Sequence, residues 1–165
     1  SEMCIRDRGY WINVFNATTV AQVLKSYPLH SIRQIDTPWQ TIVFQCKDQS
    51  FTLNAIEELL MDIGDPRIIF TLHRASISSP DLSRKPYNSK TLEEQIQSAV
   101  VNFLSDPDQN QCQKDKSYLS RIFLWYLKDF GTMKQKVKLL QKYSCTEVDE
   151  KTKIRYMPFN WQLNE

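Results

Sequence analysis

The segment from Trp11 to Leu24 constrains the fold most, because apolar residues occupy nearly every side of the helix that it would form. A helix of that kind is enclosed by a fold rather than laid on its surface. Pro28 follows and ends the helix. We therefore predict a core built around a buried N-terminal helix.

Two amides interrupt this apolar helix. Asn13 and Asn16 lie three residues apart and so share one face. A buried amide without hydrogen-bond partners costs about 1–3 kcal/mol, so both must find partners. One interpretation is that the pair holds a loop through internal hydrogen bonds, and this is the one we favour. The other interpretation, that the amides line a pocket, stays open.

The remaining elements mix hairpins and helices without regular βαβ alternation, which indicates the α+β class. We predict a single compact domain with a mixed or antiparallel sheet, the buried N-terminal helix and several packed helices. The predicted elements are a hairpin of strands 41–45 and 50–53, a helix over 54–61, an interior strand over 67–72, a helix from 91 to about 104, a strand at 118–120, helices over 122–130 and 134–143, and a strand at 154–157.

Two of these predicted elements concern candidate site residues. Asn54 and Glu57 have capping-box spacing at the start of their helix, which explains Glu57 without a catalytic role. The interior strand over 67–72 leads into a loop of small residues that contains Ser78 and Ser79. A loop at the end of a central strand is a common place for a site, and it is also an ordinary turn.

Composition narrows the classes of function. A net charge of +2 is too weak a bias to indicate nucleic acid or an anionic membrane as a partner. No apolar run approaches the roughly 20 residues of a membrane span. Two histidines without ligand spacing predict no metal site, and three unclustered glycines exclude a phosphate-binding loop, so we expect no cofactor. Cys46, Cys112 and Cys145 are expected to be buried or inert thiols; a single disulfide stays open, but no spacing selects it.

The first residues do not look like part of a domain. Residues 1–8 resemble the translation of a sequencing adapter. We therefore expect one domain over residues 9–165, forming the C-terminal part of a longer protein. Its partner is then an upstream domain or another, unknown protein. The compartment cannot be inferred from such an end.

Seven short motifs are spread over residues 10–164. In chain order they are WINVFNA at 11–17, YP at 27–28 with SI at 31–32 and PW at 38–39, LN-x-IE at 53–57, DPRI at 65–68, SSP at 78–80, LS-x-IF-x-WY-x-x-DF at 119–130, and NW-x-LN at 160–164. Together and in this order they resemble one family, the Domain of Unknown Function 547 family. The resemblance implies a domain of unassigned activity that occurs in bacterial proteins, often exported, and in eukaryotic ones.

The departures from the family pattern bear most on function. Many members carry R-I-H-F-A-L-x-C-A-S-x-S-C-P across the central segment and its loop. In this chain Ile69 takes the place of the histidine, while Arg74 and Ser79 take the places of the two cysteines. Glu58 and Asp62 stand where the family often has a histidine and an arginine. The family's own His, Cys and Arg, which could act as base, nucleophile and anion clamp, are therefore absent at these positions.

Two functions follow from this pattern. The first is a non-catalytic or degenerate module for interaction or accessory roles. The polar set that survives, either a pocket or a structural cluster, is Asn13, Asn16, Glu57, Asp65 and Arg67.

The alternative is a papain-like or serine-type hydrolase or acyltransferase. Ser79 would be the nucleophile, His73 the base, and Asn13 or Asn16 an orienting or oxyanion group. No G-x-S-x-G turn surrounds Ser79, which speaks against this reading.

Overall fold

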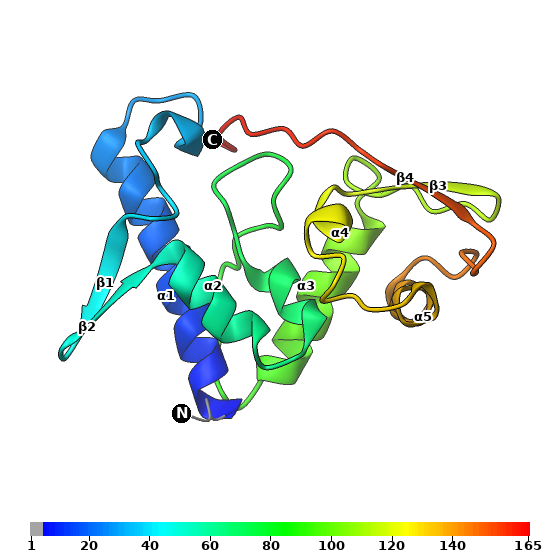
Figure 1. Ribbon diagram of the computed structural model, residues 1–165, viewed down its shortest axis with the longest axis horizontal. Helices are drawn as coiled ribbons and strands as arrows, with labels where there is room; N and C mark the ends of the chain where they lie inside the picture. The colour runs from blue at the N-terminus through cyan, green and yellow to red at the C-terminus, as the bar shows by residue number, and fades with distance from the viewer. Residues whose placement is uncertain (1–4) are drawn as a thin grey trace. The chain divides into compact units, whose positions relative to one another are not determined.

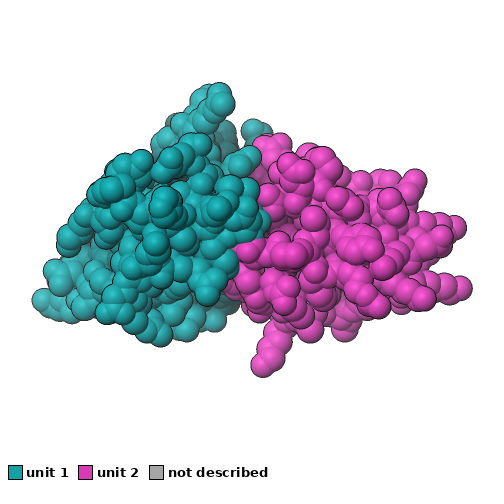
Figure 2. All heavy atoms as spheres, turned by 90° about the horizontal axis from the view of Figure 1, so that it is seen from above, with its two compact units in different colours: residues 1–96, 160–165 teal, residues 97–159 magenta. Residues whose placement is uncertain are grey.

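The computed structural model describes residues 5–165, and side chains from residue 7 onward. The expectation for residues 1–8 therefore lies partly outside the described residues. Helices make up 42% and strands 11% of the chain, which confirms the α+β class. The chain divides into two compact units (Figure 2): the first comprises Ser1–Ile96 and Asn160–Glu165, and the second Gln97–Phe159.

The first unit is built on α1 (Ile5–Ser26), drawn in blue in Figure 1. One side of this helix, which includes Tyr10 and Leu24, is exposed. Burial of the helix is therefore concentrated on one face, and two alanines limit the apolar area on the exposed face. The buried stripe follows helical spacing and consists of Ile12, Phe15, Asn16, Thr19 and Val23.

The predicted hairpin is present as β1 (Ile42–Cys46) and β2 (Gln49–Thr52), paired antiparallel with an irregularity between Ile42 and Phe44. It leads directly into α2 (Leu53–Met61) (Figure 1). The capping prediction was wrong by two residues. The Thr52 side chain, rather than that of Asn54, accepts from the Ala55 amide, so Glu57 has no capping role to fill.

The predicted interior strand over 67–72 is wrong. This segment forms η2 (Pro66–Thr71), a 3-10 helix. Pro66 supplies a helical φ at the first position, and the Asp65 side chain caps the amide of Arg67, so local capping overrides the β propensity of the isoleucines. Its residues 68–71 are buried, as expected of a central segment. A second short 3-10 helix, η1 (Ile32–Gln34), follows α1.

The second unit contains most of α3 (Leu92–Ser105), a helix that begins in the first unit. It also contains a parallel pair of strands, β3 (Lys116–Leu119) and β4 (Lys153–Tyr156), joined through α4 (Ile122–Trp125) and α5 (Met133–Tyr143). The predicted sheet is thus two separate pairs, one antiparallel and one parallel. The predicted helix over 122–130 ends early, because Tyr126 leaves the helical region.

The second unit also holds a disulfide between Cys112 and Cys145, whose Cα atoms are 5.3 Å apart. The expectation of inert thiols was therefore wrong for these two residues. Cys46 is a free, exposed thiol. In the described part of the chain no helix has the length and apolarity needed to cross a membrane.

Candidate functional site

The loop that carries Ser79 lies in the first unit and pairs with the C-terminal segment. The amides of Ile77 and Ser78 donate to the carbonyls of Gln162 and Asn160, at 2.9 and 3.2 Å. The Asn160 amide donates in return to the Ser78 hydroxyl at 2.8 Å. Two segments far apart in sequence therefore fix the loop that follows η2.

Ser79 and His73 are in contact inside this loop. The Ser79 Oγ lies 3.1 Å from Nδ1 of His73, and the two residues are 4% and 3% exposed. The same Nδ1 lies 2.7 Å from the carbonyl oxygen of Pro80. The Ser79 hydroxyl also donates to the carbonyl of Ser76 at 2.8 Å.

The Pro80 carbonyl decides which ring nitrogen of His73 carries the proton. A carbonyl oxygen only accepts, so a 2.7 Å contact with Nδ1 requires a proton on Nδ1. Burial lowers the pKa of His73 below its usual 6.5, although the contacts with Pro80, Asn164 and Asp81 act in the opposite direction. The ring is therefore neutral near pH 7, and the nitrogen that faces Ser79 has no free lone pair.

The two amides of α1 each hold a stretch of backbone. Asn16 donates to the carbonyl of Thr71 at 2.9 Å and accepts from the amide of His73 at 2.8 Å. Asn13 does the same at Tyr87, with both hydrogen bonds at 2.8 Å. Each side chain has its donor and its acceptor engaged by backbone, so the amides position the residues before and after the serine loop.

The buried Arg74 and the partly exposed Glu57 form an ion pair that the sequence did not indicate. The guanidinium of Arg74 also donates to the carbonyl of Leu72 at 3.2 Å and lies 5.9 Å from the ring centre of Phe15. At the position where many family members have a cysteine, this chain thus carries a charge with its own counter-charge. One departure from the family pattern, Arg74, read together with the matching Glu57, would have been the signal for this pair.

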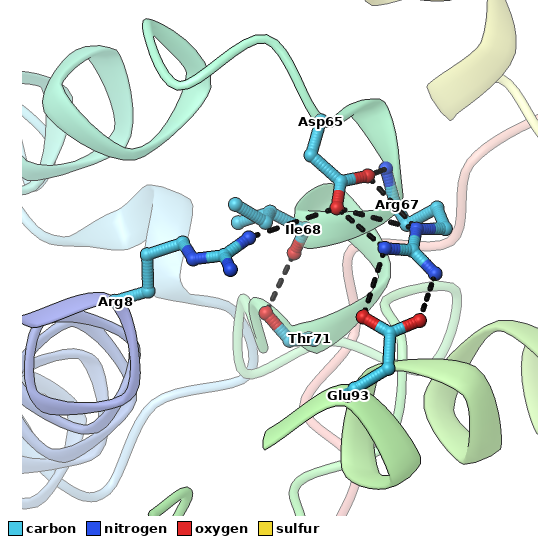
Figure 3. Close-up of polar contacts among 6 residues, drawn as sticks. All are labelled: Arg8, Asp65, Arg67, Ile68, Thr71 and Glu93. Atoms are coloured by element: carbon cyan, nitrogen blue, oxygen red, sulfur yellow. Dashed lines mark hydrogen bonds and ion pairs between the residues drawn. The ribbon is translucent and has the colours of Figure 1, made fainter. Parts of the chain in front are cut away.

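Asp65 and Arg67 lie together in a second charged group (Figure 3). The Arg67 guanidinium lies between two carboxylates, with Nη2 2.7 Å from Asp65 and Nη1 2.6 Å from Glu93. Nη1 of Arg8 approaches Asp65 at 3.8 Å. The group joins the start of η2 to the first turn of α3.

The predicted polar set is therefore divided among distinct structural contacts: the two amides on backbone, Glu57 on Arg74, and Asp65 on Arg67. A hollow of about 590 Å³ lies elsewhere in the first unit, between η1 and the start of α2, and none of the predicted site residues lines it. Among the described residues, no three His, Cys, Asp or Glu side chains are grouped to hold a metal ion.

One contributor to the site was missed. The side chain of Asn164 raises the pKa of the His73 ring, against the larger effect of burial. It belongs to the closing NW-x-LN motif. The missing signal was spatial, because 91 positions separate the two residues in sequence.

The comparisons with known proteins agree with the motifs. No curated protein and no solved structure matches the chain. A family model described as a protein of unknown function, DUF547, matches residues 7–104, which is more than half of the chain and includes Asn13, Asn16, His73 and Ser79. The chain therefore belongs to the DUF547 family.

Proposed function

We propose that this domain is a non-catalytic member of its family that serves as an interaction or accessory module. The observation that carries the proposal is the 2.7 Å contact between Nδ1 of His73 and the Pro80 carbonyl. A general base must present a lone pair to the nucleophile's proton. Here the nitrogen nearest to Ser79 is a donor, and the Ser79 proton is directed to the carbonyl of Ser76.

Energetics support the same conclusion. Moving the His73 proton to Nε2 would leave the buried Pro80 carbonyl without its donor, at a cost of about 1–3 kcal/mol. A reaction that began from this minor tautomer would be slowed about 5- to 150-fold before any chemistry. Both side chains are also almost fully buried, so a substrate could reach them only if the surrounding residues moved.

An aromatic cluster on α1 and the hairpin supports an interaction role. Trp11 packs against Phe51 with the rings tilted by 54° and their centres 4.7 Å apart, and it meets Phe44 edge-on at 5.9 Å. Beside them Tyr10 is 50% exposed and Ile42 57% exposed. Partly exposed aromatic side chains are enriched at protein interfaces. This surface is where we expect an upstream domain or another protein to bind.

The test is labelling with a fluorophosphonate probe, followed by mass spectrometry of the labelled peptide. We expect no modification of Ser79 in the folded protein. Ser83 in the following loop is exposed and serves as a matched serine. Labelling of Ser79 that exceeds that of Ser83 and disappears in His73→Gln would contradict the proposal.

Asn16→Ala separates structure from activity. The substitution leaves two buried backbone groups unpaired, so we expect a loss of about 2–4 kcal/mol in unfolding free energy. We expect no hydrolytic turnover in either the parent protein or the variant. Asn13→Ala is the matched control, because it removes the same kind of contact from Tyr87 and leaves His73 untouched. A hydrolytic activity that Asn16→Ala abolishes and Asn13→Ala preserves would overturn the non-catalytic reading.

A second candidate function is a serine hydrolase or acyltransferase. It is favoured by the 3.1 Å separation of Ser79 Oγ from His73. A serine, a histidine and an orienting amide form a known catalytic arrangement. This candidate requires the opposite tautomer of His73, and it predicts that the probe labels Ser79.

A further inference from the structure

A buried lysine in the second unit has no counter-charge. Lys136 of α5 is 4% exposed, whereas Lys134 and Lys138 on the same helix are exposed, as the sequence predicted. In the described part of the chain, its ammonium forms no ion pair, and its hydrogen-bond partner is the hydroxyl of Tyr156 at 3.5 Å. Buried charges in proteins are normally paired, so this ammonium requires an explanation.

A hollow of about 400 Å³ lies in the same unit and has Tyr156 in its lining. By strand alternation the Tyr156 side chain points to the face of the sheet opposite Arg155, toward Lys136, so the lysine lies behind the lining. No aspartate or glutamate is among the lining residues, which are Gln111, Lys116, Tyr118, Arg155, Tyr156, Met157 and Pro158.

The parallel pairing of β3 and β4 explains why cations gather there. Lys116 lies opposite Lys153, and Tyr118 lies opposite Arg155. Paired residues of neighbouring strands point to the same face, and residues two apart share it. All four are exposed, and the Lys116 ammonium lies 5.0 Å from the centre of the Tyr118 ring. One face of the sheet thus presents three cations beside an aromatic ring.

The charge balance of the unit points the same way. Residues 97–159 contain eleven lysines and arginines against seven aspartates and glutamates. The remainder of the chain contains ten against twelve. The weak overall charge therefore hides a basic unit, and the hollow lies on it.

We propose that this hollow binds a small organic anion with a flat body. Lys116 and Arg155 would hold the anionic group, and Lys136, which lies behind Tyr156, would add to the positive potential of the hollow. Tyr118, Met157 and Pro158 provide apolar contact for the flat body. The volume suits a ligand of the size of a mononucleotide, since small-molecule sites span about 300–1,000 Å³. This site is separate from the serine loop and does not depend on the proposed function.

The test uses the whole chain and measures binding by calorimetry at low salt. The probes are adenosine monophosphate and phenyl phosphate, which combine an anion with a ring. Adenosine, which lacks the anion, and inorganic phosphate, which lacks the ring, are the matched probes. We expect at least one combined probe to bind at least tenfold more tightly than either half. If neither combined probe binds below 10 mM, or if a half binds as tightly, the proposal is wrong.

Variants locate the site. We expect Arg155→Gln and Lys116→Gln each to weaken binding about tenfold, and Lys136→Met, which removes a charge behind the lining, to weaken it about threefold. Lys134→Gln removes an exposed charge of α5 outside the lining and should leave affinity within twofold. An equal loss in Lys134→Gln would mean that binding reflects diffuse charge alone, which contradicts a defined site.

A nucleic acid could bind the same cations through the phosphates of its backbone. An oligothymidylate of ten nucleotides is therefore included as a probe. Binding of this oligomer much more tightly than the mononucleotide, with a steep fall as salt rises, would indicate backbone contacts. That result would overturn the proposal of a small-ligand site.

Discussion

The two units treat buried ionisable side chains in opposite ways. In the first unit Arg74 has the carboxylate of Glu57, and His73 has the Pro80 carbonyl. In the second unit Lys136 has only a phenol hydroxyl at 3.5 Å. A buried charge that is internally paired is explained by the structure alone. A buried charge with no counter-charge is better evidence for a ligand than a paired one, even where the sequence contains no catalytic motif.

The units also differ in how they are cross-linked. Side-chain amides hold distant backbone in the first unit, whereas the second unit closes a loop with the Cys112–Cys145 disulfide across 33 positions. A covalent closure of that length restricts the unfolded chain, while amide contacts act on the folded state. Four predictions test this comparison, beginning with the largest effect.

Removing the disulfide is expected to have the largest effect. Closing a loop of this length stabilises a fold by about 4 kcal/mol in the chain-entropy model. The pair Cys112→Ala with Cys145→Ala should lose about that much unfolding free energy in urea titrations. Cys46→Ala removes an exposed thiol and is the control. Equal stability of the double variant and the parent would show that the cross-link contributes nothing.

Glu57→Gln should cost about 3 kcal/mol, because it leaves the guanidinium of Arg74 buried without its counter-charge. Glu58→Gln makes the same change at the next residue, which is exposed, and should stay within about 0.5 kcal/mol. Chemical denaturation of both variants gives the comparison. If the two substitutions have the same effect, the ion pair is not what stabilises Arg74.

The stability of the first unit should depend on pH through His73. Burial lowers the pKa of His73 in the folded protein below 6.5. As the pH falls below that value, His73 of the unfolded chain therefore binds a proton more readily than His73 of the folded protein. Stability is therefore full above about pH 6.5 and decreases below it, by at most about 1.4 kcal/mol per pH unit. His73→Gln should flatten the profile between pH 6.5 and 5. An unchanged profile in that variant would assign the dependence to other groups.

Lys136→Met should have the smallest effect, and of opposite sign. The substitution replaces an uncompensated buried ammonium with an apolar side chain of similar length. We expect the unfolding free energy to stay constant or to rise by up to about 1 kcal/mol. Thermal unfolding at pH 7 measures it. A loss of about 2 kcal/mol or more would mean that Lys136 is paired internally and would remove the comparison between the units.

Local patterns predicted much of the fold. The hairpin, α2, α5 and the exposed lysines of α5 were recognisable because periodicity and propensity agree there. The segment Pro66–Thr71 was mistaken for a strand because its run of apolar residues suits either structure when it is buried on all sides. The capping aspartate and the proline beside it were the local signals that decide the case.

The site could be predicted only in part. Ser79 and His73 were paired from their proximity in sequence, and their atoms are in contact. The partners that determine their chemistry are a backbone carbonyl, which has no sequence signature, and Asn164, which is remote in the chain. The burial of Lys136 could not be predicted for a related reason. A lysine on a helix with many lysines is expected to face solvent, and only the packing of α5 in the folded protein buries this one.

The tautomer of His73 tests the central claim most directly. Nitrogen-15-labelled protein at pH 7.5 reports in a long-range proton–nitrogen spectrum which ring nitrogen carries hydrogen. The contact with Pro80 predicts a protonated Nδ1 and an unprotonated Nε2. A proton on Nε2, with a bare Nδ1 facing the Ser79 hydroxyl, would make the pair competent for base catalysis and would contradict the account.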